Sequence, residues 1–155
     1  MRDYQREIQM RYAQGCWQHG ECETLTFDSR AAQVSHEVWK VPGCVVLNPV
    51  VFSASSLEGH FPILLSLEQQ GSLGIKIDIE YRTADLCRLG LVGLPLGRTS
   101  AGHIALDVLE NWPSQGVFDD VDADALNVDG AVVVRVHPQS SADISGSTDL
   151  GVVTE

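Results

Sequence analysis

The feature that most constrains the fold of this chain is a strict alternation over residues 75–82. Apolar side chains alternate there with charged ones, namely Ile75, Ile77, Ile79 and Tyr81 with Lys76, Asp78, Glu80 and Arg82. A period of two residues is typical of a β-strand that turns one face to the core and the other to water. We therefore expect a strand over residues 73–82, with its four apolar side chains buried.

The residues before this strand predict its partner. Residues 63–68 read ILLSLE, and QQGS separates them from the alternating stretch. The simplest interpretation is a β-hairpin whose loop uses Gly71. A short helix over residues 64–70 is the alternative.

The N-terminal stretch predicts a helix over residues 3–14. Tyr4, Ile8 and Tyr12 recur every four positions and form one apolar stripe. Asp3 can cap the start of this helix, and Gly15 can end it. An amphipathic helix of this kind packs on a sheet.

Several other stretches favour strands or turns. Residues 29–41 fit a helix and a strand equally, whereas Pro42-Gly43 indicates a turn. Pro49 lies inside the apolar run CVVLNPVVF, which favours an edge strand or a bent strand. The stretches ETLTFD, HIALDVLENW and GAVVVRVH also have strand character, and GLVGLPLG reads as a loop.

These elements together predict an α+β fold in which strands dominate. The expected architecture is one antiparallel sheet, curled or half closed into a barrel, with the N-terminal helix packed on it. At 155 residues the chain is long enough for one domain with a sizeable core. We expect a single globular domain over residues 1–137. Residues 138–155 are rich in Ser, Asp and Gly, which predicts a flexible tail.

The charge of the chain is acidic and unevenly distributed. The formal net charge is −11, and residues 103–155 hold one basic and ten acidic side chains, which gives −9 for that stretch. Such a surface repels a phosphate backbone, so nucleic acid is not expected as a partner. It attracts a basic protein and accelerates association with it, or it serves solubility alone.

The location of the protein is predicted from what the sequence lacks. No stretch approaches the roughly 20 apolar residues of a membrane span. The N-terminus is charged where a signal peptide needs an apolar segment. We therefore expect a cytoplasmic protein without a membrane partner, whose four cysteines are reduced.

The motif Gly59-His60-Phe61-Pro62 is the candidate catalytic feature. It resembles the start of the active-site motif of hot-dog-fold 3-hydroxyacyl thioester dehydratases. In that family the histidine precedes a buried helix that holds a catalytic carboxylate, and the motif continues Gly-x-Pro-x-x-Pro-Gly. Here residues 63–66 read ILLS, and Glu68 comes several residues too early for that carboxylate. His60 is then a turn residue at a strand entrance, with catalysis by His60 and Glu68 as the weaker alternative.

A second motif, CWQHGEC, suggests a metal site. Cys16, His19 and Cys22 supply three soft ligands, and His36 or Cys44 could complete a tetrahedron around zinc. Structural zinc sites usually need a second pair of close ligands, which this chain lacks. We expect no bound metal and no cofactor.

The densest acidic stretch is DDVDADALNVDG, residues 119–130. Asp120, Asp122 and Asp124 follow the opening of a calcium loop, but the sixth and twelfth positions are Ala125 and Ala131 instead of glycine and glutamate. A solvated acidic loop is therefore the better interpretation. The candidate binding residues are Asp119, Asp120, Asp122, Asp124 and Glu110.

Two classes of function are compatible with these observations. The first is a small acidic protein that neutralises or sequesters a basic protein partner. In type it is similar to the small cytosolic immunity proteins that block bacterial toxins, which are acidic, single-domain and without a catalytic motif. The alternative is a small-molecule or acyl-thioester enzyme or binder of hot-dog or open-barrel type, with His60 or His103 in a pocket. A structural subunit of a larger assembly would show the same composition, and homo-oligomerisation is compatible with either class.

Overall fold

The protein is described from a computed structural model, which describes residues 2–19, 23–25, 32–35, 37–56, 64–122, 124–126, 128 and 130–135. The elements, in chain order, are α1 (Arg2–Tyr12), β1 (Trp17–His19), β2 (Glu23–Leu25), β3 (Gln33–Ser35), β4 (Val38–Val45), β5 (Asn48–Ser55), α2 (Leu67–Leu73), β6 (Ile75–Asp78), β7 (Thr83–Leu86), η1 (Cys87–Leu89), β8 (Leu91–Pro95), β9 (Gly97–Arg98), β10 (Ile104–Ala105), η2 (Asp124–Leu126) and β11 (Val132–Val133).

The strands form antiparallel sheets around the long β4–β5 hairpin. The main sheet has the order β1-β4-β5-β11, and a second sheet has the order β6-β7-β8. Two short pairs, β2-β3 and β9-β10, complete the described strands. The α+β fold with dominant strands is thus confirmed. Among the described residues, however, no sheet is closed or strongly curled, so the expected half-barrel is not what forms.

The predicted N-terminal helix is confirmed, and its apolar stripe faces the sheet. Ile8 is fully buried, which stabilises the fold by roughly 1.5–3 kcal/mol. The Tyr4 hydroxyl donates a hydrogen bond to the Pro42 carbonyl on β4 at 2.6 Å. Burial raises the pKa of Tyr4 far above its ordinary value. The helix ends at Tyr12, and Ala13 follows with a positive φ of 52°.

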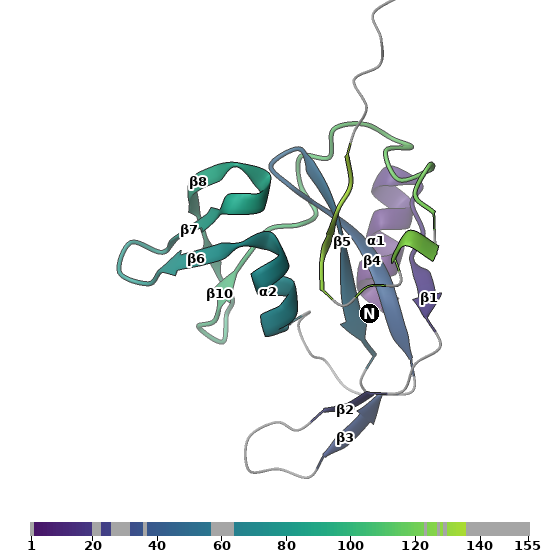
Figure 1. The fold of residues 1–155 in the computed structure, drawn as a ribbon, viewed down its shortest axis with the longest axis horizontal. Helices are drawn as coiled ribbons and strands as arrows, with labels where there is room; N and C mark the ends of the chain where they lie inside the picture. Colours follow the sequence, from purple (N-terminus) through teal and green to yellow (C-terminus); the bar gives the residue numbers. More distant parts are fainter. Residues whose placement is uncertain are drawn as a thin grey trace, which may run out of the picture.

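The two faces of the main sheet are covered by different parts of the chain. Successive strand residues point to opposite faces, so Val50 and Phe52 face one side and Val51 faces the other. Val50 and Phe52 pack with Leu73 of α2 and Leu86 of β7. Val51 packs in a second cluster with side chains from the acidic third of the chain. Figure 1 shows β4 and β5 between α1 on one side and α2 with the three-stranded sheet on the other.

The turn predicted at Pro42-Gly43 is wrong, because both residues lie inside β4. The amide of Cys44 donates to Val108 and so points away from β5, and alternation places the missing N–H of Pro42 on the same outer side. Proline therefore removes no bond to β5. A Cβ at Gly43 would lie 2.8 Å from the Phe52 ring, so glycine lets this ring pack on the strand.

The β4–β5 hairpin turns instead at Val46-Leu47, which both have positive φ, 46° and 65°. This places Pro49 in β5, an inner strand of the sheet, so of the two expectations the edge strand is wrong. The Pro49 carbonyl accepts a bond from the Val134 amide just beyond β11. Pro49 thus lies directly before Val50, the residue at which the pairing of β5 with β11 ends.

The predicted hairpin between residues 63–68 and 73–82 is also wrong, and the helical alternative is the better description. Residues 67–73 form α2, with Gly71 inside it. The Ser66 hydroxyl caps the helix by accepting from the Gln69 amide, and Gly74 ends it in the left-handed region, with φ 64°. Gln69 is buried and bonds both the amide and the carbonyl of Ser53 on β5, each at 2.8 Å.

The alternating stretch forms a strand, but only over β6, and its apolar side chains are mostly exposed. Ile75 is partly buried, whereas Ile77, Ile79 and Tyr81 are 46%, 74% and 73% exposed. The strand ends at Asp78, and residues 79–82 form the turn to β7. The alternation correctly predicted a shared face for Ile75 and Ile77. It could not predict that the hairpin extends beyond the elements that cover this face.

The structure also changes the bounds of other expected loops and strands. The expected loop at residues 90–97 contains β8 and the first residue of β9, whereas the expected strand from residue 104 is limited to β10. The ambiguous residues 29–41 contribute strands where they are described. The domain boundary at residue 137 and the tail lie outside the described residues. Neither of the two described α-helices has the length and apolar character needed to cross a bilayer.

Candidate acidic binding surface

The predicted acidic residues belong to a segment that two buried side chains attach to the main sheet. Phe118 and Leu126 are almost completely buried in the cluster around Val51. Between them lie the four candidate aspartates, all of them exposed, Asp119, Asp120, Asp122 and Asp124. We call residues 118–126 the acidic loop, of which the structure describes residues 118–122 and 124–126. The acidic loop therefore has a buried apolar side chain at each end and exposed carboxylates between them.

Turn hydrogen bonds order the acidic loop. The Val121 amide donates to the Phe118 carbonyl, and the Ala125 amide donates to the Asp122 carbonyl. The Asp122 side chain accepts from the Asp124 amide at 3.0 Å, which is an Asx turn. Within the described part of the chain, the carboxylates of Asp119, Asp120 and Asp124 make no hydrogen bond or ion pair. These three carboxylates are therefore exposed to water, and turn hydrogen bonds hold the backbone that carries them.

An aromatic cluster joins the acidic loop to the N-terminal third of the chain. The Phe118 ring makes edge contacts with Trp17 and Trp112, at centroid distances of 6.4 and 5.1 Å. Trp112 in turn stacks on Tyr12 of α1, with parallel rings 4.1 Å apart. These contacts bring together residues that are about a hundred positions apart in the sequence, so no local pattern predicted them.

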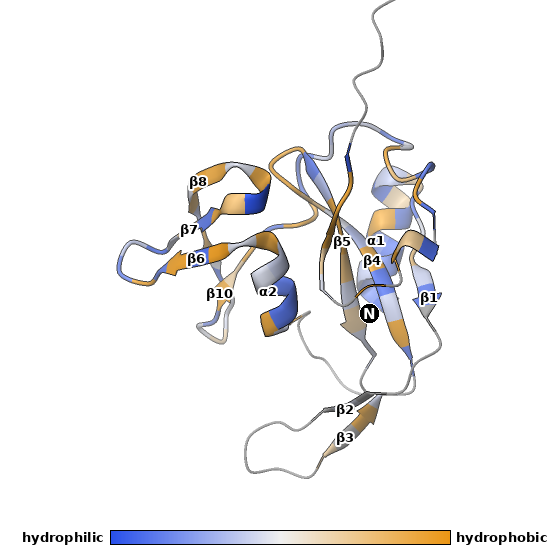
Figure 2. Cartoon of the chain, viewed as in Figure 1, coloured by the Kyte–Doolittle hydropathy of each residue, from blue (hydrophilic) through white to orange (hydrophobic). Residues whose placement is uncertain are grey.

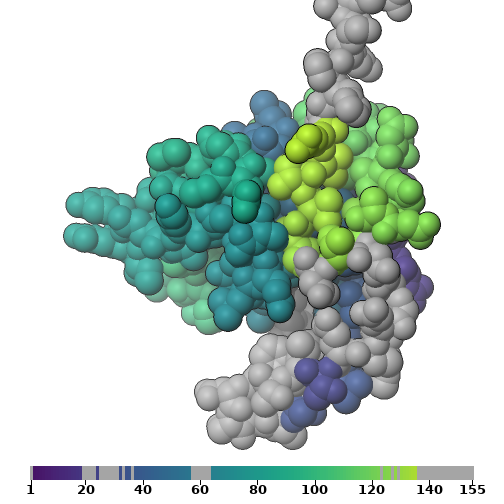
Figure 3. Space-filling model, viewed as in Figure 1, coloured from purple at the N-terminus to yellow at the C-terminus, as the bar shows by residue number. Residues whose placement is uncertain are grey.

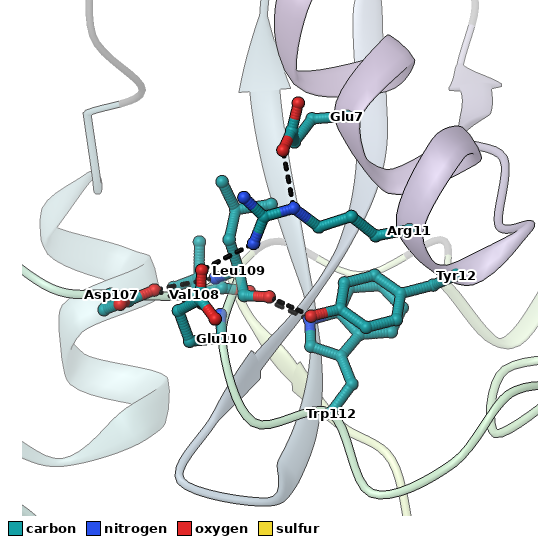
Figure 4. Close-up of polar contacts among 8 residues, drawn as sticks. All are labelled: Glu7, Arg11, Tyr12, Asp107, Val108, Leu109, Glu110 and Trp112. Atoms are coloured by element: carbon teal, nitrogen blue, oxygen red, sulfur yellow. Dashed lines mark hydrogen bonds and ion pairs between the residues drawn. The ribbon is translucent and has the colours of Figure 1, made fainter.

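Glu110, the fifth predicted residue, is engaged in a contact within the protein. Arg11 lies between Glu7 and Glu110 and makes an ion pair of 2.5 Å with each carboxylate (Figure 4). Hydrogen bonds to Glu110 and Glu7 raise the pKa of Arg11. The three side chains are 39–55% exposed, so water screens the network and it adds little stability. Its geometric effect is to hold the segment after β10 against the end of α1.

The same segment is held by bonds to its main chain (Figure 4). The Tyr12 hydroxyl donates to the Leu109 carbonyl, and the Trp112 ring nitrogen donates to the Val108 carbonyl at 3.2 Å. Asp107 accepts from the amides of Leu109 and Glu110. The backbone that leads toward the acidic loop is therefore fixed on α1.

Lys40 on β4 is a residue of this region that the sequence analysis did not single out. It is only 7% exposed, and its ammonium donates to the Ser53 hydroxyl at 2.8 Å and to the Val128 carbonyl at 3.0 Å. It thus joins the chain just after the acidic loop to the sheet. A signal was present in the run Val38-Trp39-Lys40, because a strand with Val38 inward also turns Lys40 inward.

The other candidate sites are not assembled by the described residues. Glu68 is exposed in the first turn of α2, whereas His60 lies outside the described residues. His103 is exposed after the turn between β9 and β10. The structure therefore places neither Glu68 nor His103 in a buried site, and the catalytic hypothesis for His60 stays a prediction.

The zinc hypothesis is only partly covered by the structure. Cys22 and His36 lie outside the described residues, as does the side chain of His19. Burial raises the pKa of Cys16 and of Cys44 to about 11, which opposes the thiolate form that a metal or an electrophile needs. The Cys44 thiol donates to the Asn111 carbonyl at 3.4 Å. No group of three or more His, Cys, Asp or Glu side chains in the described part of the chain is arranged to hold a metal ion.

The chain was compared with protein-family models, with curated proteins and with solved structures. None of the three comparisons gave a match.

Proposed function

We propose that this chain is a small acidic cytoplasmic protein that neutralises or sequesters a basic protein partner, in the manner of an immunity protein that inhibits a toxin. The observation that supports this most directly is the acidic loop. Its exposed carboxylates lie on a short stretch of backbone that Phe118 and Leu126 anchor at both ends. Solubility alone requires acidic residues, but it does not require that they be concentrated and held in place.

The anchoring matters because binding has an entropic cost. A loop that is already ordered loses less freedom when it meets a partner, so more of the electrostatic attraction remains as affinity. The four aspartates also repel one another, and a basic partner relieves this repulsion. The binding surface is therefore the acidic loop, with Glu110 held by Arg11 and contributing to the negative field around it.

Charged groups of this kind act mainly on the association rate. The test requires the partner, which can be isolated on the immobilised chain from the native host and released by salt. Association is then measured by stopped flow with the purified partner. Replacing the four aspartates by asparagine is expected to slow association at least about tenfold at low salt. The difference should shrink above physiological ionic strength, where the screening length is about 8 Å.

A matched control separates position from net charge. The variant D3N/E37Q/E68Q/E80Q removes the same number of charges from exposed residues elsewhere. It is expected to slow association far less than the loop variant. Equal effects of both variants would reduce the acidic loop to one part of a general negative field. Unchanged association of the loop variant at low salt would reject the proposal.

A further inference from the structure

The β6–β7 hairpin carries a group of exposed apolar side chains on and beside an edge strand. Figures 1 and 3 show it protruding from the side of the molecule opposite α1, and Figure 2 shows hydrophobic residues along β6. Ile77, Ile79 and Tyr81 are all exposed there. The acidic loop belongs to the other face of the main sheet, so this surface is distinct from the one proposed above.

The hairpin also has an open hydrogen-bonding edge. Among the described strands β6 pairs only with β7. The Cys87 amide bonds the Gly74 carbonyl, and alternation along an antiparallel ladder then places the next bonded pairs at Lys76/Asp85 and Asp78/Thr83. The amides and carbonyls of Ile75 and Ile77 consequently point away from β7. Such an edge is a template for another strand.

The charges along β6 discriminate between the ways in which two copies could pair. If two β6 strands meet antiparallel with Lys76 opposite Lys76, like charges lie directly opposite each other. Moving the two-fold axis by one residue places Ile77 opposite Ile77 and Lys76 opposite Asp78 on both sides of the axis. The second register pairs opposite charges. The outward amide and carbonyl of Ile77 meet a strand partner in both registers, so the charges decide between them.

The apolar face supports the same register. Ile77 of each copy would cover Ile77 of the other, on the side of the sheet that also holds Ile75 and the buried residues of β7. The charges of β6 and the turn after it, residues 75–82, are balanced, with Lys76 and Arg82 beside Asp78 and Glu80. The site is thus locally neutral in a chain of net charge −11, which lets two copies approach here.

We propose that β6 pairs antiparallel with β6 of a second copy of this chain, with Ile77 opposite Ile77, so that two three-stranded sheets join into one across a two-fold axis. The contact is isologous, since each copy uses the same edge. An edge of four residues and a few exposed side chains falls below the roughly 1,200 Å² of a standard interface, so the dimer belongs to the weak class.

Charge reversal tests both the surface and the register. Sedimentation velocity of the wild-type chain is expected to show a monomer–dimer equilibrium that depends on concentration. The variant K76E places a glutamate opposite Asp78, and the variant D78K places a lysine opposite Lys76. Each variant alone should raise the dimer dissociation constant at least about tenfold, because two attractive pairs become repulsive. An equimolar mixture of the two variants restores both pairs and should form a heterodimer.

The mixture also guards against misfolding, because a variant that fails to fold would not recover dimerisation when mixed. Far-UV circular dichroism of each variant should match that of the wild type. A wild-type chain that stays monomeric at its solubility limit would overturn the proposal. A dimer that both single variants leave intact would place the interface elsewhere, and a mixture that stays monomeric would reject the register.

Discussion

At the scale of single residues, several side chains supply bonds that the strand ladders lack. Gln69 takes the place of a neighbouring strand by bonding both the amide and the carbonyl of Ser53. Tyr4 reaches the carbonyl of Pro42, and Lys40 reaches that of Val128. Buried backbone groups must find partners, and these long side chains reach them across gaps between elements.

Tyr12 allows one such bond to be tested without disturbing its packing. Tyr12→Phe keeps the stacked ring on Trp112 but removes the hydroxyl that donates to Leu109. The free energy of unfolding should fall by about 1 kcal/mol, since a neutral hydrogen bond contributes about 0.5–1.5 kcal/mol. Urea denaturation measures this difference. Tyr81→Phe, at an exposed position, is the control and should change stability by less than about 0.5 kcal/mol.

At the scale of elements, the β4–β5 hairpin has an unusual turn. Its two loop residues, Val46 and Leu47, both have positive φ, as a two-residue turn between right-twisted strands requires. Side chains with a Cβ are disfavoured in that region, by roughly 1–2 kcal/mol per residue, and Asn-Gly is the preferred pair. The Asn48 side chain supports the turn by donating to the carbonyls of Val45 and Val46.

The double variant Val46→Asn, Leu47→Gly is therefore expected to stabilise the protein by about 1 kcal/mol. A rise in the urea midpoint with an unchanged slope would show this. The control is Val46→Ala, Leu47→Ala, which removes the same exposed apolar groups but keeps a Cβ at both positions. If the alanine variant gains as much as the Asn-Gly variant, strain in the turn is not the cause.

At the scale of the whole molecule, β5 couples two apolar clusters. Val50 and Phe52 belong to the cluster with α2 and β7, and the adjacent Val51 belongs to the cluster with Phe118 and Leu126. Because one strand serves both clusters, the described fold should unfold in one cooperative transition. Two of the three tryptophans, Trp17 and Trp112, pack in the second cluster, so they make tryptophan fluorescence sensitive to that side.

This cooperativity can be tested from the opposite face. Leu86→Ala creates a cavity in the first cluster and should lower stability by about 2–5 kcal/mol. The fluorescence midpoint should move together with the circular dichroism midpoint, although Trp17 and Trp112 lie in the other cluster. Ile79→Ala is the control, because Ile79 is exposed and its loss should cost less than about 0.5 kcal/mol in dilute protein. Separate midpoints in Leu86→Ala would mean that the two clusters unfold independently.

The charge of the candidate surface could be predicted from the sequence, but the contacts that anchor it could not. The aspartates of residues 119–124 are adjacent in the sequence, so composition alone reveals them. The contacts that hold them involve Tyr12, Trp17 and Trp112, together with Phe118, across long separations. Likewise, nothing in the local sequence distinguishes the free aspartates from Glu110, whose partner Arg11 lies 99 positions away.

What the sequence by itself determined is the set of features that depend on nearby residues. The stripe of Tyr4, Ile8 and Tyr12 specified a helix and the face that it buries, and the alternation from Ile75 specified a strand. Only the tertiary structure decided how far that strand runs and which of its apolar residues are covered. Periodicity assigns side chains to a common face, but burial requires another element to lie on that face. For Ile77 and the residues after it, no described element fully covers that face.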